Sequence, residues 1–168
     1  KNKINRVRYK NFLILSVGRL VNYKGYNIAI KAIKYLPLRY KLVIIGDGIN
    51  KKKLLTQIKD LNLNKRVKII DNADDQLKEK FLKKSSIFLM CSTSRAESFG
   101  IAILEAISYG LPLIISNVKG SGMNDMISNN FNGYKFKNFS SIDCAKKILK
   151  LSNSNKNLKQ FSKNSLKL

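Results

Sequence analysis

The feature that most constrains the fold of this chain is a repeated alternation between short apolar runs and longer amphipathic stretches. The apolar runs expected to be strands are residues 12–17, 41–45, 67–70, 87–90, 112–115 and 134–136. The stretches expected to be helices are residues 26–36, 50–62, 74–84, 100–109, 122–128 and 141–151. Continuous apolar strands joined by amphipathic helices are typical of a parallel sheet covered on both faces. The pattern therefore predicts an α/β fold with a doubly wound, Rossmann-like parallel sheet.

The length of 168 residues suits a single domain, which would bury roughly 70% of its unfolded surface. Residues 1–10 are polar and basic without a core pattern, and we expect them to be a linker arriving from something upstream, which the resemblance described below implies to be a missing N-terminal domain. Residues 11–151 carry the alternating pattern and form the domain itself. Residues 152–168 are rich in Ser, Asn and Lys, and we expect a polar C-terminal tail that is partly helical.

The formal charge of +23, from 33 basic and 10 acidic residues, has two interpretations. One is a polyanionic partner: nucleic acid, an acidic membrane surface or a phosphorylated ligand. The other is the coding bias that also enriches Asn and Ile, together with one modest basic cleft. The lysines are spread over almost every segment, which favours the second interpretation.

The residue types for several kinds of chemistry are missing. The chain has no histidine, so Ser-His-Asp and Cys-His catalytic sets are excluded. Cys91 and Cys144 lack metal-ligand partners and are expected to be small buried thiols in a reducing cytoplasm. Asp71, Asp74 and Asp75 do not form a D-x-D motif. Asp74 and Asp75 fit the N-terminus of a helix better than a metal site. No apolar run approaches the roughly 18 residues that span a bilayer, and no signal-peptide pattern is present.

Two carboxylates are the most informative polar residues. Glu97 falls on the predicted loop after strand 87–90, and Glu105 follows with seven residues between them, on the helix expected from Gly100 onward. Unpaired N–H groups at a helix start bind anions, and diphosphates commonly bind there. A carboxylate only accepts hydrogen bonds, so it suits sugar hydroxyls. The pair therefore indicates a ligand with hydroxyls on both sides of a diphosphate, as in a nucleotide-sugar.

A second motif, GRLVNYKG, follows the first predicted strand and contains Arg19 and Lys24. These cations could neutralise a diphosphate, Arg19 through its planar fork and Lys24 as a point charge. Alternatively, Arg19 caps a surface loop and Lys24 is one lysine among many. Because the carboxyl ends of parallel strands share one sheet edge, we expect this motif to lie beside Glu97 and Glu105.

Two glycine-rich turns are less specific. Gly46-Asp47-Gly48 could let the backbone approach a nucleotide or could be an ordinary tight strand-to-helix turn, and no GxGxxG fingerprint is present. Gly120-Ser121-Gly122, followed by Asp125, could be a second phosphate-facing turn or simply a helix start.

Taken together, these motifs resemble the C-terminal domain of family 4 retaining glycosyltransferases, which have two Rossmann-like halves facing across a cleft. The matching segments are residues 18–25, 46–48, 96–110, 111–116, 120–127 and 132–134. The resemblance implies that residues 11–151 are a nucleotide-sugar-binding domain, one half of a glycosyltransferase-B fold. The acceptor site would lie in the missing N-terminal half.

The resemblance also implies residue roles. Glu97, Arg19 and Lys24 would be the catalytic residues, with the cations on the diphosphate and Glu97 on the sugar hydroxyls. Glu105 would hold the ribose. The remaining donor-binding positions would be Gly18, Gly46, Ile70, Asn72, Ser98, Phe99, Gly100, Ile101 and Ala102. Ser98, Phe99 and Gly100 would lie beneath the sugar, Ile101 and Ala102 would offer backbone N–H groups to phosphate, and the segment from Ile70 to Asn72 would line the base. The family usually has glycine where Asn72 stands.

The implied activity is that of a retaining, metal-independent hexosyltransferase without a cofactor, in cell-surface polysaccharide synthesis. Its acceptor would be a glycan or a lipid-linked sugar, and its location the cytoplasm, with peripheral contact at the inner face of the membrane. The isolated chain is expected to lack full activity. The alternatives are an epimerase or phosphorylase of the same architecture and a basic nucleic-acid-binding module. The second requires exposed aromatics among the cations, whereas these aromatics fall mostly at predicted core positions, so no nucleic-acid partner is expected.

Overall fold

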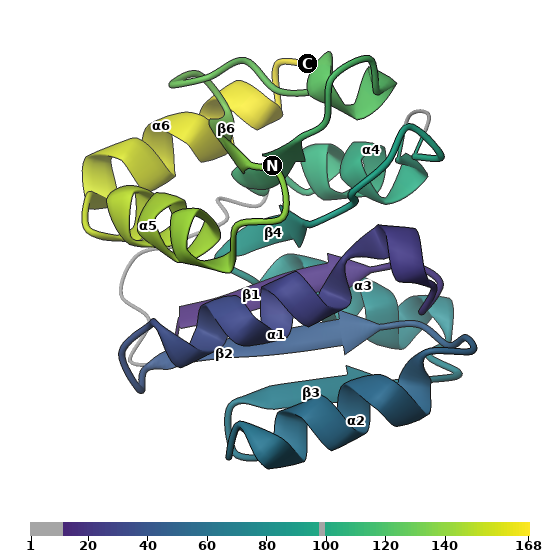
Figure 1. Cartoon of the computed structure of the whole chain (residues 1–168). Coiled ribbons are helices and arrows are strands. Elements are labelled where there is room, and N and C mark those ends of the chain that lie inside the picture. The colour runs from purple at the N-terminus through teal and green to yellow at the C-terminus, as the bar shows by residue number, and fades with distance from the viewer. Residues whose placement is uncertain (1–11, 98–99) are drawn as a thin grey trace.

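The computed structural model describes residues 12–97 and 100–168 and contains one six-stranded sheet, all of whose paired strands are parallel (Figure 1). The strand order is β3-β2-β1-β4-β5-β6. The strands are β1 (Phe12–Val17), β2 (Tyr40–Ile45), β3 (Val67–Ile70), β4 (Ile87–Met90), β5 (Leu113–Asn117) and β6 (Gly133–Lys137). The helices are α1 (Tyr26–Lys34), α2 (Lys51–Asp60), α3 (Asp75–Lys84), α4 (Ile101–Ser108), α5 (Ser141–Ser152) and α6 (Asn155–Ser165), with 3-10 turns η1 (Asn22–Lys24) and η2 (Gly122–Asn124). The doubly wound Rossmann-like prediction is confirmed.

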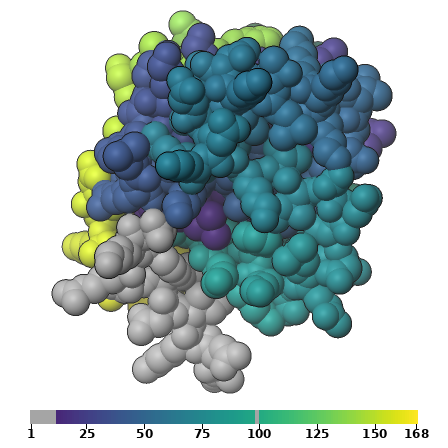
Figure 2. Space-filling model, turned by 90° about the horizontal axis from the view of Figure 1, so that it is seen from below, coloured from purple at the N-terminus to yellow at the C-terminus, as the bar shows by residue number. Residues whose placement is uncertain are grey.

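The sheet separates two apolar cores. Successive strand side chains point to opposite faces, so Ile14 lies in the core beneath α1, α2, α5 and α6, while Leu15 lies in the core beneath α3 and α4. Figure 1 shows the first group of helices in front of the sheet. In Figure 2, the β3 edge is seen from below, and the segments coloured blue to teal, which include α2 and α3, form most of the visible surface.

The acidic residues after β3 have structural partners. Asp74 caps α3, where its side chain accepts a hydrogen bond from the N–H of Leu77 at 2.7 Å, and Asp75 occupies the first turn. Asp71 pairs with Lys51, and that hydrogen bond lowers the pKa of the Asp71 carboxyl. The helix N-terminal interpretation of Asp74 and Asp75 is confirmed. Among the described residues, no group of three or more side chains could hold a metal ion.

The polar C-terminal segment, residues 152–168, contains the helix α6, which packs against the domain. Leu158 and Phe161 of α6 are buried, and the Phe161 ring meets the Tyr134 ring edge-on at 5.3 Å. The Asn164 amide donates to the carbonyl of Phe131 at 2.7 Å. Two apolar residues three positions apart thus fasten a polar sequence to the domain.

The predicted helix at 122–128 is shorter than expected, because only the 3-10 turn η2 forms there. Cys91 and Cys144 are buried free thiols, as predicted, and burial raises the pKa of Cys144. In the part of the chain described here, no helix is both long and apolar enough to cross a membrane.

Candidate functional site

The loops that follow β1 and β2 are joined by backbone contacts at the carboxyl edge of the sheet. The N–H of Gly18 donates to the carbonyl of Ile45 at 2.9 Å, and the N–H of Leu20 donates to the carbonyl of Asp47 at 2.8 Å. A Cβ on Gly46 would lie 2.1 Å from the carbonyl oxygen of Gly18, and Gly46 has a φ of +149°. Gly46 is therefore required for two loops to touch, which gives the Gly46-Asp47-Gly48 turn a structural explanation.

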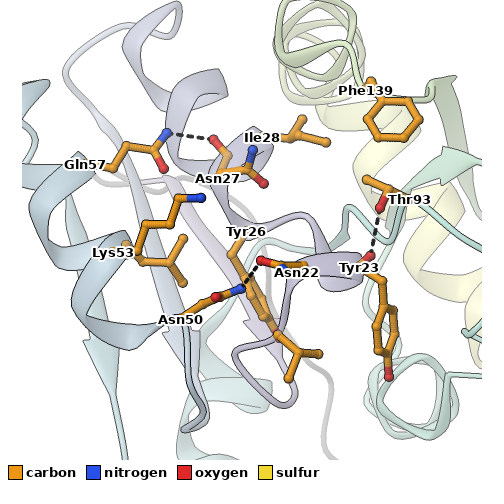
Figure 3. A pocket seen from close by; sticks show the side chains of 12 residues that line it. Asn22, Tyr23, Tyr26, Asn27, Ile28, Asn50, Lys53, Gln57, Thr93 and Phe139 are labelled. Atoms are coloured by element: carbon orange, nitrogen blue, oxygen red, sulfur yellow. Dashed lines mark hydrogen bonds between the residues drawn. The ribbon is translucent and has the colours of Figure 1, made fainter.

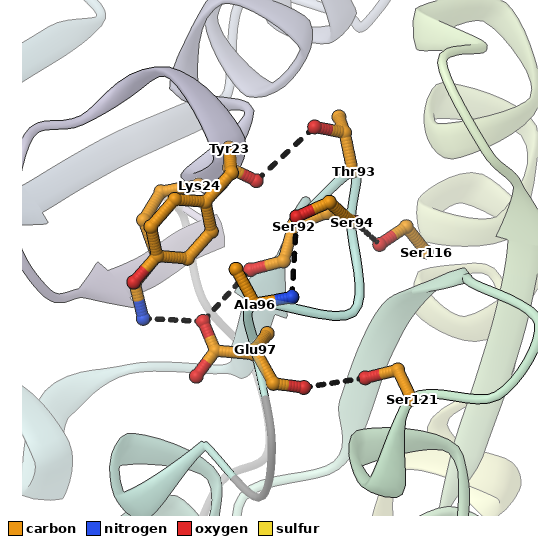
Figure 4. Close-up of polar contacts among 9 residues, drawn as sticks. All are labelled: Tyr23, Lys24, Ser92, Thr93, Ser94, Ala96, Glu97, Ser116 and Ser121. Carbon is orange, nitrogen blue, oxygen red and sulfur yellow. Dashed lines mark hydrogen bonds and ion pairs between the residues drawn. The ribbon is translucent and has the colours of Figure 1, made fainter.

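Lys24 and Glu97 form an ion pair at the centre of this edge (Figure 4). Ser92 Oγ donates to Glu97 Oε2 at 3.0 Å, and Ser121 Oγ donates to the Glu97 carbonyl at 2.6 Å. Ser116 Oγ in turn donates to the Ser92 carbonyl. Glu97 is only 6% exposed, so these serine and lysine donors replace the water that a buried carboxylate needs. Ser92 and Ser116 were not predicted from the sequence, because nothing along the chain marks them as neighbours of Glu97.

The η1 turn positions Lys24. It closes on Gly25, which has a φ of +64° and whose Cβ would lie 2.0 Å from the carbonyl oxygen of Cys91. The N–H of Thr93 donates to the carbonyl of Tyr23 at 2.7 Å. The loop after β1 is therefore seated on the loop after β4, which brings Lys24 to Glu97.

Tyr26 presents a buried hydroxyl to the same place. Tyr26 is 5% exposed. A Cβ placed on Gly18 would lie 3.0 Å from Tyr26 Oη and 3.4 Å from Lys24 Nζ, so both groups are next to Gly18. Burial first, and then the charge of Glu97, raise the pKa of Tyr26. No described residue accepts or donates a hydrogen bond at this hydroxyl. The sequence pattern placed Tyr26 among the core residues. An apolar pattern does not distinguish a tyrosine whose hydroxyl lies in the core from one whose hydroxyl faces a site.

Arg19 is exposed and forms no ion pair or hydrogen bond through its guanidinium with any described residue. It follows Gly18 directly, so its backbone is fixed at the same sheet edge. The structure thus brings Gly18, Lys24, Gly46 and Glu97 together, and it leaves the Arg19 side chain directed to solvent.

Helix α4 begins beside this cluster. Gly100 caps it in the left-handed conformation with a φ of +63°, and the N–H of Ile103 donates to the Gly100 carbonyl at 2.6 Å. Among the described residues, none accepts a hydrogen bond from the N–H groups of Ile101 and Ala102. The positive end of the α4 dipole therefore meets the loop that carries Glu97. Ser98 and Phe99 lie outside the described residues.

Glu105, on the second turn of α4, is separate from the Lys24–Glu97 cluster. Its Oε1 accepts from Lys78 Nζ at 2.8 Å, and Lys78 also pairs with Asp75 at 3.3 Å. The hydrogen bond to Glu105 is the largest cause that raises the pKa of Lys78. A cavity of about 310 Å³ adjoins these residues. The sequence did not predict that Lys78, which lies on α3, would contact Glu105. The ion pair uses Glu105 Oε1 and leaves Oε2 outside it.

The segment expected to line a base follows β3. The Ile70 carbonyl accepts from the N–H of Gly46 at 2.8 Å, so this main-chain group already has a partner. Asn72 is exposed and has a φ of +48°. A positive φ is what glycine adopts most readily and what asparagine tolerates better than most residues, which explains how Asn72 can stand where the resembling family has glycine.

The turn from Gly120 to Asp125 lies against Arg95. Arg95 Nε donates to the Lys119 carbonyl at 3.1 Å, and a Cβ on Gly120 would lie 3.0 Å from the same nitrogen. A cavity of about 570 Å³ adjoins this turn. Through Ser121 the turn also holds the Glu97 backbone, so it supports the loop that carries Glu97.

The family model described as Glycosyl transferases group 1 matches residues 1–168. An uncharacterized glycosyltransferase of Haemophilus influenzae is 30% identical over 137 residues, which is 80% of this chain and 37% of that protein. The UDP-Gal:alpha-D-GlcNAc-diphosphoundecaprenol alpha-1,3-galactosyltransferase of Escherichia coli is 33% identical over 144 residues, 80% of this chain and 35% of that protein.

Among solved structures, Anabaena HepE in complex with UDP superposes with a TM-score of 0.85 at 24% identity. That match covers 94% of this chain and 43% of HepE. The chain spans about a third of the length of the curated relatives it matches.

Proposed function

The chain belongs to the group 1 glycosyl transferases, and on that premise we propose that it is the donor-binding half of a retaining hexosyltransferase. It would move a sugar from a nucleotide-sugar to a glycan or lipid-linked acceptor during cell-surface polysaccharide synthesis. The relatives support the pathway class, since one is named an amylovoran biosynthesis glycosyltransferase and another an O-antigen biosynthesis glycosyltransferase.

The observation that carries this proposal is the ion pair between Lys24 and Glu97 next to the start of α4. A sugar nucleotide places hydroxyls directly beside a diphosphate. An ammonium and a carboxylate held in contact can therefore bind neighbouring parts of one donor, Lys24 on the diphosphate and Glu97 on the sugar. The hydroxyl of Tyr26 supplies a further group that can donate to or accept from the ligand here.

The remaining donor groups would bind along α4. The N–H groups of Ile101 and Ala102 would bind a phosphate, with Gly100 allowing the chain to enter the helix in the left-handed conformation. Glu105 Oε2 would accept from a ribose hydroxyl while Oε1 remains with Lys78. Arg19 would fold onto the diphosphate from solvent and form a two-pronged contact.

These groups suit a reaction in which negative charge develops on a departing diphosphate. The bond from the anomeric carbon to the diphosphate oxygen breaks, and its electron pair leaves with the nucleoside diphosphate. A bond from the same carbon to the acceptor oxygen forms on the same face of the sugar, and a diphosphate oxygen takes the acceptor proton. Lys24, Arg19 and the α4 N-terminus would stabilise the charge that develops, which is commonly the largest contribution to catalysis.

Donor binding by the 168-residue chain tests the proposal directly. Thermal shifts would be compared for UDP-, GDP-, ADP- and dTDP-sugars, beginning with UDP-glucose because HepE has been crystallised with it. We expect one of these donors to stabilise the chain and a single-stranded oligonucleotide of equal charge not to do so. If the oligonucleotide stabilises the chain and no donor does, a basic nucleic-acid-binding module would replace the proposal.

We also expect negligible transfer by this chain alone, because transfer needs donor and acceptor held in register. Adding a separately expressed acceptor-binding half should restore turnover. Sustained turnover by the 168-residue chain on a natural acceptor would show that this segment carries both sites.

A further inference from the structure

A further hollow lies away from Glu105, on the sheet face covered by α1 and α2. It is a cavity of about 420 Å³ between the first turns of α1 and α2, closed at one side by Phe139 (Figure 3). A larger hollow of about 790 Å³ adjoins it and shares its lining residues Asn27, Ile28, Lys53, Gln57 and Phe139. Together the two form a groove, called here the α1–α2 groove, and both volumes are in the range of small-molecule sites.

Carboxamides dominate the polar lining of the inner cavity. Asn22, Asn27, Asn50 and Gln57 all line it. Asn50 Nδ2 donates to Asn22 Oδ1 at 2.7 Å, and Gln57 Nε2 donates to the Asn27 carbonyl at 2.9 Å (Figure 3). These bonds hold three of the amides in place. They leave Asn50 Oδ1 and Gln57 Oε1 as acceptors, Asn22 Nδ2 as a donor, and both ends of the Asn27 amide for a ligand.

Apolar groups form the rest of the lining. Leu54 and Ile28 are buried beneath the cavity, and Phe139 stands at its edge with 70% of its surface exposed. Phe139 has a φ of +62°, an uncommon conformation for a residue with a large side chain. The neighbouring Asn138 fixes this turn by donating to the carbonyl of Thr93 at 3.1 Å. An exposed aromatic ring is therefore held over a cavity lined with amides.

We propose that the α1–α2 groove binds a neutral saccharide chain. A sugar ring has one apolar C–H face, which suits the Phe139 ring, and hydroxyls that both donate and accept, as carboxamides do. Among the described residues, Lys53 is the one charged side chain that lines the inner cavity, and the outer hollow adds Lys31 and Asp60. Two cations beside a carboxylate are too few to follow a nucleic-acid backbone. Four amides would be costly to cover with a lipid tail, because it offers them no hydrogen bonds.

The groove leads toward the cluster described above. Tyr23 lines its inner end and precedes Lys24, and Thr93 binds the carbonyl of Tyr23 from the loop that carries Glu97. A saccharide in the groove would therefore lie near the donor site, on the opposite sheet face from Glu105. The proposal concerns binding alone, so it stands whether or not the chain transfers sugar.

Titration followed by two-dimensional proton–nitrogen NMR tests this site. The probes are maltotriose, galactotriose and N,N′,N″-triacetylchitotriose, with a hyaluronan tetrasaccharide and inorganic phosphate as anionic probes. We expect at least one neutral trisaccharide to shift the side-chain amide signals of Asn22, Asn27, Asn50 and Gln57, with a millimolar dissociation constant. Absence of shifts with all three trisaccharides would overturn the proposal. So would shifts caused only by the anionic probes and lost in Lys53→Gln.

Two variants in the groove and one control outside it keep the test specific. Phe139→Ala should weaken binding roughly tenfold, whereas Phe131→Ala, another partly exposed phenylalanine, should not. Asn27→Ala removes an exposed amide that makes no side-chain hydrogen bond to a described residue, and it should weaken binding without altering the fold. Equal losses in Phe139→Ala and Phe131→Ala would overturn the assignment to this groove. A parallel titration with UDP reports on the donor site separately, so failure of one site is distinguishable from failure of the other.

Discussion

Lys24 and Glu97 stand 73 residues apart in the chain, yet their charges meet in a contact that leaves the two side chains only 13% and 8% exposed. Removing two charges from water is costly, and the cost is offset only when partners remain in place. Ser92 contributes a further hydrogen bond to the same Glu97 oxygen. The pair therefore fixes the position of both side chains before a donor arrives.

Replacement of Lys24 by Met should destabilise the fold. The buried Glu97 carboxylate would lose its cation, which typically costs about 3–5 kcal/mol. Urea denaturation would measure the change. Lys52→Met, at an exposed position of α2, is the matched control and should be nearly neutral. Equal losses in the two variants would show that the ion pair contributes no more than a surface lysine.

The two glutamates should separate the parts of the donor. Glu97→Gln should spare binding of a nucleoside diphosphate, because Lys24 is then free for the phosphates, and should weaken a nucleotide-sugar by about 1.5–3 kcal/mol. Glu105→Gln should weaken both ligands, because both contain ribose. Calorimetric titration of UDP and a UDP-sugar would report this. A uniform loss in Glu97→Gln would place Glu97 away from the sugar.

Arg19→Ala should affect binding and leave stability unchanged. The Arg19 side chain is exposed, and no described residue forms an ion pair with it, so the fold does not depend on it. A charged hydrogen bond to a diphosphate is worth about 1.5–3 kcal/mol, so affinity for the diphosphate should fall about tenfold or more. Lys52→Ala serves as the control for bulk charge. If it lowers affinity as much, the attraction is diffuse and not located at Arg19.

Tyr26 should make the free energy of unfolding depend on alkaline pH. Burial raises its pKa, so above the ordinary value of 10.0 the unfolded chain releases a proton that the folded chain retains. Stability is then lost as pH rises from that value, with a slope of up to about 1.4 kcal/mol per pH unit. Tyr26→Phe should reduce the slope, and Tyr35→Phe, at an exposed tyrosine, should not. Identical slopes in all three proteins would contradict the buried phenol.

Donor binding should persist in EDTA. The positive field proposed for the diphosphate comes from Lys24, Arg19 and the start of α4. We expect the dissociation constant to be unchanged when EDTA replaces Mg²⁺ or Mn²⁺ in the titration. Binding that disappears in EDTA and returns with Mn²⁺ would require a metal ion that these residues do not explain.

The fold was largely predictable because the apolar periodicity is strong. The bounds predicted for the strands at 12–17, 67–70 and 87–90 match β1, β3 and β4. The packing of α6 was not predicted, because Leu158 and Phe161 are too few to dominate a polar segment. At 122–128 only the short turn η2 forms, directly after Lys119 and Ser121, which contact Arg95 and Glu97.

The site was predictable only in part. The motifs placed Gly18, Lys24, Gly46 and Glu97 at one sheet edge, where the structure also has them. They gave no sign that Lys24 and Glu97 bind one another, because pairing across the sheet depends on how the loops after β1 and β4 are seated. For the same reason Ser92, Lys78 and the Tyr26 hydroxyl were missed: each reaches the site from an element whose sequence pattern indicates only packing or solvent exposure.

The position of β1 between β2 and β4 has a consequence for the timing of motion in this molecule. Its residues Ile14 and Leu15 pair on both sides, with Leu42 and Val43 of β2 and with Ile87 and Phe88 of β4. Amides in such a strand exchange with deuterated solvent only when the whole domain opens. Arg19 lies a few residues further along the same strand and loop, yet it is exposed. We therefore expect the slowest-exchanging backbone of the domain to adjoin a side chain that reorients within nanoseconds. In the proposed function, Arg19 would then close on the donor without disturbing the strand that positions it.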